Sequence, residues 1–468
     1  MNPYSWFVPI SRVCLVAVAI LSVSESASAD WKEKVLYSFK AGADGRLPQG
    51  GVVLDSAGNL YGTTSESGSE GCPSSGCGTV FEISPPTEKD GKWTETILYT
   101  FQGISDGKTD GAVPVGGVII DEKGNLYGTT AYGGSGPCKL SGSTTGCGIV
   151  YELSPPPQKG GQWTHTILHN FQGGNDGQFP WGDLVFDNKG NLYGATQFGG
   201  GKGTTCDPFY QYCGTVFELN PPTTGGGKWK EKVLHRFVGV ASGQQLGDGA
   251  DPNGGLVLDS KGSIYGTTYF GGSVKGECNG GSGGTGCGTV FEIIPPAKKD
   301  GAWAESVIYR FNGSDGATPA AGIIFNGTGH LYGTAFAGAN NGDGAVFELV
   351  APKEGQGPWK ETMLCRFKDG SDGENPRAGL TLHTDGNLYG ATYAGSAFSG
   401  TVFRLTPPKD KGDAWTLGIL HGFTGSPDGA QPAANLIFDK EGNFYSTTQL
   451  GGTGGCTFGC GTIFEVFP

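Results

Sequence analysis

The sequence predicts an all-β fold, a seven-bladed β-propeller with four strands in each blade. Three observations support this fold class. A β-hairpin motif occurs seven times, a strand that begins with tryptophan also occurs seven times, and each end of the chain holds an incomplete unit. Repeats of this kind bury their apolar surface only when neighbouring units stack, so they indicate one closed array rather than separate domains.

The hairpin motif is clearest at residues 121–130, which read DEKGNLYGTT. It consists of a short apolar run, a turn that opens with Asp or Asn, and a second run that contains Leu and Tyr. The copies begin at Asp55, Asp121, Asp187, Asp259, Asn326, His383 and Asp439. A type I turn closed by a bulge requires a positive φ near its end, which glycine adopts without a Cβ clash. The glycines at this position are Gly58, Gly124, Gly190, Gly262, Gly329, Gly386 and Gly442.

The tryptophan strand first appears as WKEKVLYSF. Its copies begin at Trp31, Trp93, Trp163, Trp229, Trp303, Trp359 and Trp415, roughly 56 to 74 residues apart. That spacing suits a four-stranded propeller blade with one long loop. In the first complete unit we predict strands A, B, C and D at residues 51–55, 59–64, 78–83 and 93–101.

The ends of the chain predict how the ring closes. The last unit ends at its C strand, residues 461–466, whereas the first strand, residues 31–39, belongs to no unit of its own. We therefore expect the N-terminal strand to complete blade 7, which leaves no free sheet edge in the ring. A β-solenoid is the alternative fold, but solenoids need terminal caps and this chain repeats almost to Pro468.

Residues 1–29 are predicted to be a signal peptide, and residues 30–468 a single propeller domain. Arg12 precedes an apolar run at residues 13–23, and residues 27–29 form an A-x-A cleavage site. A membrane anchor is the alternative, but the run is shorter than the roughly 20 residues that span a bilayer. We therefore expect a secreted or periplasmic protein with no membrane span after cleavage.

The formal net charge is −13, and the sequence contains no basic stripe. An acidic surface repels phosphate backbones, so we expect no nucleic acid partner. We expect a monomer whose partner is a glycan or an extracellular protein.

The units resemble the GloVer repeat family, a tandem repeat of Gloeobacter and Verrucomicrobium proteins. The resemblance lies in the elements LYxF, DGxxPxxGLxxDxxGNLYGTT and GTVFEL, which recur in order over nearly the whole chain after the leader. It implies an exported, propeller-like repeat protein with no established activity, and it supplies no catalytic residue. The GNLYG hairpin is also similar, over a short stretch, to NHL-type and senescence-marker-protein-type propellers.

Ten cysteines fall as two in each of five loops between strands B and C. In an oxidising compartment this pattern predicts five local disulfides, each restricting a long glycine-rich loop. Zinc is the alternative, but no loop offers the four ligands of a structural site. The pairs are Cys72 and Cys77, Cys138 and Cys147, Cys206 and Cys213, Cys278 and Cys287, and Cys456 and Cys460.

One position of strand D carries Tyr or His in six blades and Cys365 in the remaining one. The histidines at this position are His169, His235 and His421. We interpret them as structural substitutions for tyrosine, and Cys365 as a packed side chain rather than a nucleophile.

One aspartate precedes glycine in each loop between strands D and A. These residues are Asp44, Asp106, Asp176, Asp248, Asp315, Asp372 and Asp428. Asx-type turns explain Asp-Gly pairs, and the functional alternative is a carboxylate ring that binds Ca²⁺ or sugar hydroxyls. We expect no other cofactor. A second acidic set lies in the C strands, but a catalytic carboxylate pair needs two different environments, and similar blades repeat the same one.

In a four-stranded meander, the D-to-A and B-to-C loops leave from one face and the other turns leave from the opposite face. Differences between blades concentrate in the first set, so we expect a ligand to bind on that face. The aromatic candidates there are Trp181, Phe209, Tyr210 and Tyr212.

Two functions follow from these observations. The first is a secreted, non-enzymatic module that binds a glycan or a protein through the disulfide-loop face. The alternative is a hydrolase or lactonase with a metal or substrate site at the central channel. An enzyme should break the repeat symmetry with polar residues that face the channel, and Asp183 and Asn435 stand where other blades carry glycine. We assign no catalytic residue.

Overall fold

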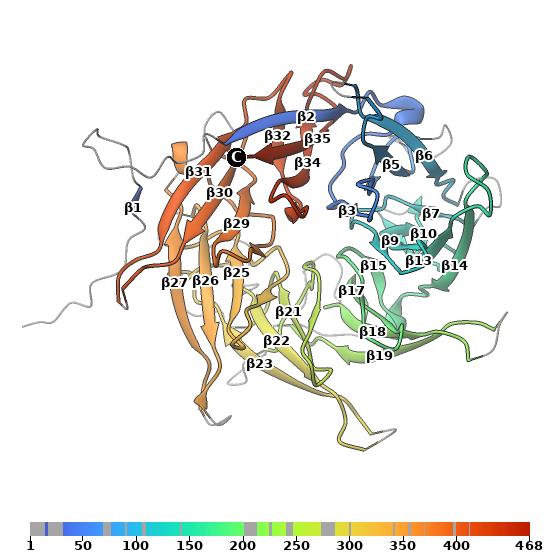
Figure 1. Ribbon diagram of the computed structural model, residues 1–468. Coiled ribbons are helices and arrows are strands. Elements are labelled where there is room, and N and C mark those ends of the chain that lie inside the picture. The colour runs from blue at the N-terminus through green and yellow to red at the C-terminus, as the bar shows by residue number, and fades with distance from the viewer. Residues whose placement is uncertain are drawn as a thin grey trace, which may run out of the picture.

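The computed structural model forms a ring of seven blades around a central channel (Figure 1). It describes residues 15–16 and 31–468, apart from residues 69–75, 89–90, 105–108, 141–142, 201–212, 224–226, 240–246, 273–285, 299–300, 340–341, 354–356, 369, 396–398 and 411. Each blade is an antiparallel sheet of four consecutive strands, A to D from the channel outward. The predicted seven-bladed propeller is therefore confirmed.

Strand A comprises β3 (Val53–Leu54), β8 (Ile119–Ile120), β16 (Val185–Phe186), β20 (Val257–Leu258), β24 (Ile324–Phe325), β28 (Thr381–Leu382) and β33 (Ile437–Phe438). Strand B comprises β4 (Leu60–Thr64), β9 (Leu126–Thr130), β17 (Leu192–Phe198), β21 (Ile264–Thr268), β25 (Leu331–Ala335), β29 (Leu388–Thr392) and β34 (Phe444–Gly451). Strand C comprises β5 (Thr79–Ser84), β13 (Ile149–Ser154), β18 (Thr215–Asn220), β22 (Thr289–Ile294), β26 (Ala345–Val350), β30 (Thr401–Thr406) and β35 (Thr462–Phe467). Strand D comprises β6 (Thr94–Thr100), β14 (Thr164–Asn170), β19 (Lys230–Arg236), β23 (Ala304–Arg310), β27 (Lys360–Arg366), β31 (Thr416–Gly422) and β2 (Lys32–Ser38).

Short strands complete the description. β15 (Gln178–Pro180) joins β17, β32 (Gly429–Pro432) joins β34, and β1 (Leu15–Val16) pairs in parallel with β31. Two small ladders, β7 (Gly111–Ala112) with β10 (Tyr132–Gly133) and β11 (Lys139–Leu140) with β12 (Ser143–Thr144), lie in loops of blade 2. Single 3-10 turns, η1 (Gly42–Asp44), η3 (Gly174–Asp176) and η6 (Gly370–Asp372), occur in D-to-A loops.

The ring closes as the sequence predicts. β2 pairs with β35 from Lys32 opposite Phe467 to Ser38 opposite Thr462, so the N-terminal strand supplies the fourth strand of blade 7. On the channel side, the Thr447 hydroxyl of blade 7 donates a hydrogen bond to the Gly50 carbonyl of blade 1. The N-terminal strand therefore completes blade 7, and a hydrogen bond joins blade 7 to blade 1 at the channel.

The hairpin turn is explained by one aspartate. Asp55 accepts hydrogen bonds from the Ala57 and Asn59 amides, and from the Tyr61 hydroxyl at 3.1 Å. Gly58 completes the turn at φ 87°. The Asp, Asn, Gly and Tyr of the motif thus build one turn, which satisfies backbone donors that neither strand can pair.

The glycine of the LYGTT run makes room for strand C. A Cβ on Gly62 would lie 2.6 Å from the Phe81 ring, and Phe81 is completely buried. Six blades carry glycine at this position, and blade 7 carries Ser446. The aromatic residue of strand C is therefore packed across strand B, and both faces of each blade are buried against neighbours.

Among the described residues, no helix has the length and apolar character needed to cross a membrane.

Candidate functional site

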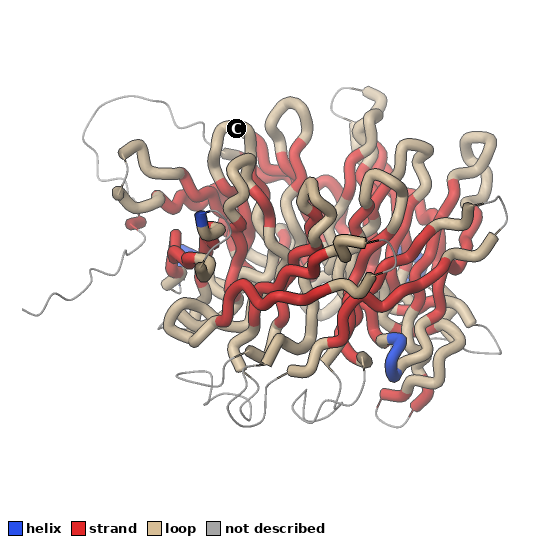
Figure 2. Tube along the Cα trace, turned by 90° about the horizontal axis from the view of Figure 1, so that it is seen from below, coloured by secondary structure: helices blue, strands red, loops and turns tan. Residues whose placement is uncertain are grey.

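The D-to-A and B-to-C loops lie side by side. Backbone bridges join the two loops of a blade at Arg46 and Glu66, at Ala250 and Phe270, and at Ala317 and Ala337. Figure 2 shows the strands between two faces that are formed by loops and turns. The D-to-A and B-to-C loops therefore share one face, as expected from the sequence, and this face is here called the loop face.

The aspartates of the D-to-A loops contact their own blades. Asp44 accepts hydrogen bonds from the Tyr37 hydroxyl at 2.6 Å and from the Lys40 amide. Equivalent bonds from Tyr or His side chains, or from the nearby backbone, reach Asp176, Asp248, Asp315 and Asp428. These contacts give the repeated aspartate a role in shaping its loop.

The loop between blades 1 and 2 differs from the sequence-based expectation. There the residue with these contacts is Asp110, which accepts from the Tyr99 hydroxyl and the Gln102 amide. Asp106, the aspartate chosen from the sequence, lies outside the described residues. Asp372 is buried, and it is the aspartate of the blade whose strand D carries Cys365.

A glutamate from the next blade faces each of several Asp and Tyr/His pairs. Glu33, His421 and Asp428 place three ligand-type atoms within 4.8 Å of one another, as do His235, Asp248 and Glu305. Burial and the neighbouring Asp428 carboxylate raise the pKa of Glu33 to about 7. Tyrosine replaces the histidine at other junctions, so the three ligand-type groups are not common to all of them, whereas burial raises the pKa of a strand D glutamate at five junctions.

At the junction between blades 5 and 6, apolar residues replace both the Tyr or His of one strand D and the facing Glu or His of the next strand D. Cys365 and Leu417 lie in one buried cluster, in place of the Tyr or His and the Glu or His found at other junctions. Cys365 is a buried thiol, in agreement with its predicted packing role.

Two of the predicted disulfides are fully described, between Cys138 and Cys147 and between Cys456 and Cys460. Cys77, Cys213 and Cys287 are also disulfide-bonded. Cys72, Cys206 and Cys278, their predicted partners, lie outside the described residues.

The second cysteine of each pair is anchored to the next blade. The carbonyl of Cys147 accepts a hydrogen bond from the Phe179 amide at 2.9 Å, and the Cys213 carbonyl accepts from Asp251. Ser399 has the same role in a loop without cysteines, where it accepts from Gln431. The residue that donates precedes a proline and has a positive φ in every blade, between 49° and 62°. Non-glycine residues rarely adopt a positive φ, so its recurrence in all seven blades indicates that the fold imposes this conformation. It directs the chain into strand A beside the channel.

The residue after that proline points to the mouth of the channel. The seven residues are Gln49, Val115, Trp181, Asn253, Ala320, Arg377 and Ala433, and they line a narrow cavity of about 90 Å³. Glycines behind them pack closely; a Cβ on Gly50 would lie 2.3 Å from the Gly117 amide nitrogen. The channel therefore narrows below a ring of dissimilar side chains.

Asp183 and Asn435 occupy equivalent positions at the channel. Asp183 Oδ1 accepts from the Gly117 amide at 2.7 Å, and Asn435 Oδ1 accepts from the Gly379 amide at 2.6 Å. Burial raises the pKa of Asp183, although the hydrogen bond from Gly117 opposes that shift. The Asn435 side chain makes the same contact as the Asp183 carboxyl group, so the contact does not require a charge. Each residue links its blade to the preceding one.

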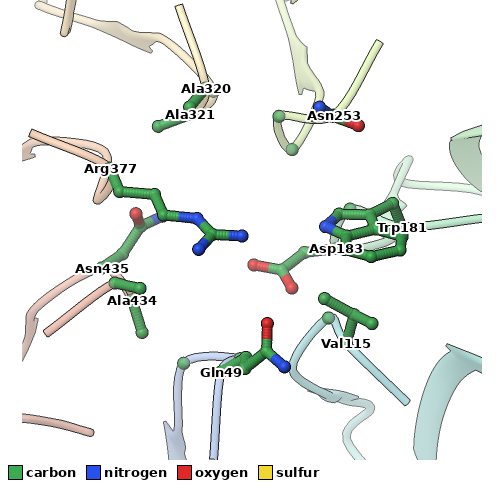
Figure 3. Close-up of a pocket in the computed structure, with 18 of the residues that line it drawn as sticks. Gln49, Val115, Trp181, Asp183, Asn253, Ala320, Ala321, Arg377, Ala434 and Asn435 are labelled. Atoms are coloured by element: carbon green, nitrogen blue, oxygen red, sulfur yellow. The ribbon is translucent and has the colours of Figure 1, made fainter. Parts of the chain in front are cut away.

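A larger pocket opens beside the channel mouth, over blades 3 to 6. It has a volume of about 360 Å³, within the range of about 300 to 1,000 Å³ usual for ligand pockets. It is lined by Trp181, Gln197, Asp251, Asn253, Tyr269, Ala320, Phe336, Arg377 and Tyr393. Figure 3 shows Arg377, Asp183 and Gln49 pointing into the channel, with Trp181 beside Asp183.

This pocket breaks the sevenfold repeat. The first residue after the YGTT run is Gln197, Tyr269, Phe336 and Tyr393 in blades 3 to 6, but Ser65 and Ala131 in blades 1 and 2. The ring of Tyr269 lies 6.5 Å from that of Phe336. Aromatic side chains therefore gather on one side of the mouth.

Polar atoms of the wall are left for a ligand. Asn253 Oδ1 in this wall and Gln449 Nε2 in the adjoining channel cavity are buried and have no hydrogen-bond partner in the described part of the chain. Buried polar atoms are normally satisfied, so these two require water or a ligand. The wall thus combines aromatic faces with the unpaired side-chain carbonyl of Asn253.

Of the aromatic residues singled out on sequence, Trp181 lies in this pocket, whereas Phe209, Tyr210 and Tyr212 are outside the described residues. Sequence reasoning missed Asn253, Tyr269, Phe336, Tyr393 and Arg377. The sequence did contain a signal, because the residue after the proline and the residue after the YGTT run carry dissimilar side chains in the seven copies.

The fold and the pocket define a seven-bladed β-propeller with one asymmetric cavity on its loop face. Residues 277–468 match the family model of the Gloeobacter/Verrucomicrobia repeat, which confirms the resemblance read from the motifs. The sequence has no match among curated proteins.

Solved structures give distant likenesses. A Trichoderma reesei member of carbohydrate-active enzyme family AA12 has 12% identity and a TM-score of 0.41, with 94% of this chain and 96% of that chain covered. A provisionally assigned 6-phosphogluconolactonase from Bacteroides uniformis has 14% identity and a TM-score of 0.47, covering 83% and 88%. A Xanthomonas campestris gluconolactonase has 14% identity and a TM-score of 0.34, covering 68% and 78%. Likeness at this level says nothing about activity.

Proposed function

We propose that this protein is an exported, non-enzymatic propeller that binds a glycan in the pocket on its loop face. The observation that carries the proposal is the broken symmetry of the mouth, where aromatic and amide side chains gather over blades 3 to 6. Aromatic faces pack against the apolar faces of sugar rings, and amides pair with hydroxyl groups. The disulfides support export, because such bonds persist in oxidising compartments.

A glycan array screened with the full chain, followed by calorimetry on the best saccharide, tests the proposal. Trp181→Ala should weaken binding at least about tenfold, because aromatic anchors commonly contribute more than 1 kcal/mol at a binding surface. Its thermal midpoint should stay unchanged, since Trp181 is half-buried and lies at the mouth. Val115→Ala, at the equivalent position of blade 2, is the matched control. Equal binding by wild type and Trp181→Ala would contradict the proposal.

The alternative, a hydrolase or lactonase, draws on Asp183, a carboxyl group that faces the channel. Asp183→Asn should preserve the contact with the Gly117 amide, as Asn435 does in its own blade. We expect unchanged glycan binding and no lactone or glycoside hydrolysis by either protein. Hydrolysis by the wild type that disappears in Asp183→Asn would favour the alternative.

A further inference from the structure

Arg377 is the cation of the pocket. It follows Pro376 at the entry to blade 6, and its guanidinium extends toward the centre of the channel (Figure 3). The guanidinium carbon lies 5.4 Å from the ring centroid of Tyr393. Within the described residues, the guanidinium makes no hydrogen bond or ion pair, so its donors face the cavity.

The lack of a protein partner for the Arg377 guanidinium points to a ligand, because acidic groups that could pair with it are abundant in the chain. There are 44 Asp and Glu residues against 31 Lys and Arg residues, yet none of the described acids pairs with Arg377. By contrast, Arg46 on the same face pairs with Glu66 at 2.6 Å. A half-buried arginine without a protein partner retains the full fork that matches a carboxylate in two parallel hydrogen bonds.

The neighbouring acids leave this charge in place. Asp183 projects from the opposite side of the channel, but burial raises the pKa of its carboxyl group and thereby disfavours its charged form. Its Oδ1 is already used by the Gly117 amide. Asp251 lines the same pocket, but it is buried and forms no ion pair with Arg377 within the described residues. The accessible charge at the centre of the pocket is therefore that of Arg377.

The side chains around Arg377 provide aromatic faces and a buried hydrogen-bond acceptor beside the positive charge. Tyr393 is fixed by a hydrogen bond from its hydroxyl to Gln431 Oε1 at 2.8 Å, and it supports the guanidinium from one side. Trp181 and Tyr269 also line the pocket and offer aromatic faces, and Trp181 lies across the channel from Arg377 (Figure 3). Asn253 Oδ1 is a buried acceptor that a sugar hydroxyl can satisfy.

We propose that the pocket recognises an acidic saccharide, with Arg377 binding the carboxylate of a uronic acid while the aromatic wall and Asn253 bind its ring and hydroxyl groups. This inference rests on the proposed glycan function and specifies its ligand class. A peptide with a free carboxylate is the competing ligand.

The test compares oligomers of galacturonate, glucuronate and mannuronate, each with its carboxyl-reduced counterpart, by calorimetry on the full chain. At least one acidic oligomer should bind at least about tenfold more tightly than its reduced form, as expected for one charge-assisted bidentate contact. Arg377→Gln should abolish that preference while the reduced oligomer binds as before. Arg236→Gln removes the same charge from an exposed site on strand D and should leave the preference intact.

The outcomes separate this inference from the proposed function. Binding of neutral and acidic oligomers with equal affinity, with loss in Trp181→Ala, would overturn the acidic ligand and leave the glycan function standing. An Arg377→Gln protein that keeps the acid preference would also overturn it. Tighter binding of a sulfated oligomer than of the uronate would reject the carboxylate. Binding of a C-terminal peptide in the absence of any saccharide binding would reject both.

Discussion

At the scale of single residues, the repeat is a set of steric and hydrogen-bond requirements. Gly62 lacks a Cβ because Phe81 fills that space, and the Asp55 carboxylate accepts hydrogen bonds from the Ala57 and Asn59 amides of the hairpin turn. The same residues recur because each blade poses the same local problem. Positions free of such requirements, such as Trp181 and Arg377, are available for ligand contact.

We expect Gly62→Ala to destabilise the protein by about 1 to 3 kcal/mol, the usual cost of overpacking a core. The added methyl group would meet the Phe81 ring at 2.6 Å, and φ at Gly62 is not in the positive region, so the effect is steric. Urea unfolding measures it. Gly51→Ala, where the nearest atom is 3.8 Å from the added Cβ, should be tolerated, and equal destabilisation by both variants would reject the packing argument.

The residue scale also shows what sequence could supply. The turn was predictable because Asp, Asn and Gly act within a few residues of one another. The loop between blades 1 and 2 has two Asp-Gly pairs, at Asp106 and Asp110, and the sequence does not show that Asp110 accepts a hydrogen bond from the Tyr99 hydroxyl. The pocket was missed for a similar reason, because Tyr269 and Arg377 come from different blades and only the ring brings them together.

At the scale of elements, strand D places a half-buried glutamate at several of the junctions between blades. Burial, followed by the charge of a neighbouring aspartate, raises the pKa of Glu95 to about 8 and that of Glu361 to about 7. Burial also raises the pKa values of Glu33, Glu231 and Glu305 to about 7. Strand D therefore holds protons near neutral pH at several blade junctions.

These shifts predict that stability falls as pH rises. The folded protein binds protons more tightly than the unfolded chain, so this contribution is complete below the ordinary glutamate pKa and disappears as pH passes about 7 to 8. His165 acts in the opposite sense, because burial lowers its pKa, but it is one group against five. Thermal midpoints should decrease from pH 5 to pH 8.5. Glu361→Gln should flatten the slope, and Glu88→Gln, at an exposed site, should not.

The apolar pair at the junction between blades 5 and 6 suggests a double substitution that introduces the same pair at another junction. Glu33→Leu combined with His421→Cys reproduces the Leu417 and Cys365 pair at the junction of blades 6 and 7. Replacing buried ionisable groups by packed apolar ones is often neutral or stabilising. We expect a thermal midpoint at pH 8 at or above that of the wild type. A lower midpoint at both pH 5 and pH 8 would show that the ionisable set is required there.

At the scale of the whole molecule, ring closure was predictable because the two incomplete units are visible at the ends of the chain. The length of strand A was not: residues 51–55 were predicted, but the ladder is confined to Val53–Leu54. Its first residues instead meet neighbouring blades at the channel, where Gly50 and Gly117 approach backbone to backbone. Only the closed ring creates that contact.

Deleting residues 31–39 should expose the edge of β35 and cause aggregation or loss of the cooperative thermal transition. A synthetic peptide of residues 31–39 should restore the transition, because it supplies the missing strand. A truncated protein that stays monomeric and melts as before would refute closure by β2.

The claim that the loop face carries the binding pocket is tested most directly by hydrogen–deuterium exchange with and without the tightest-binding saccharide. We predict slower exchange at residues 181–183, 196–198, 268–270, 376–378 and 392–394, which surround the pocket. The turns at residues 121–125 and 187–191, which include Lys123 and Lys189, should exchange unchanged because they lie on the opposite face. Protection of those turns, with unchanged exchange around Trp181 and Arg377, would contradict the account.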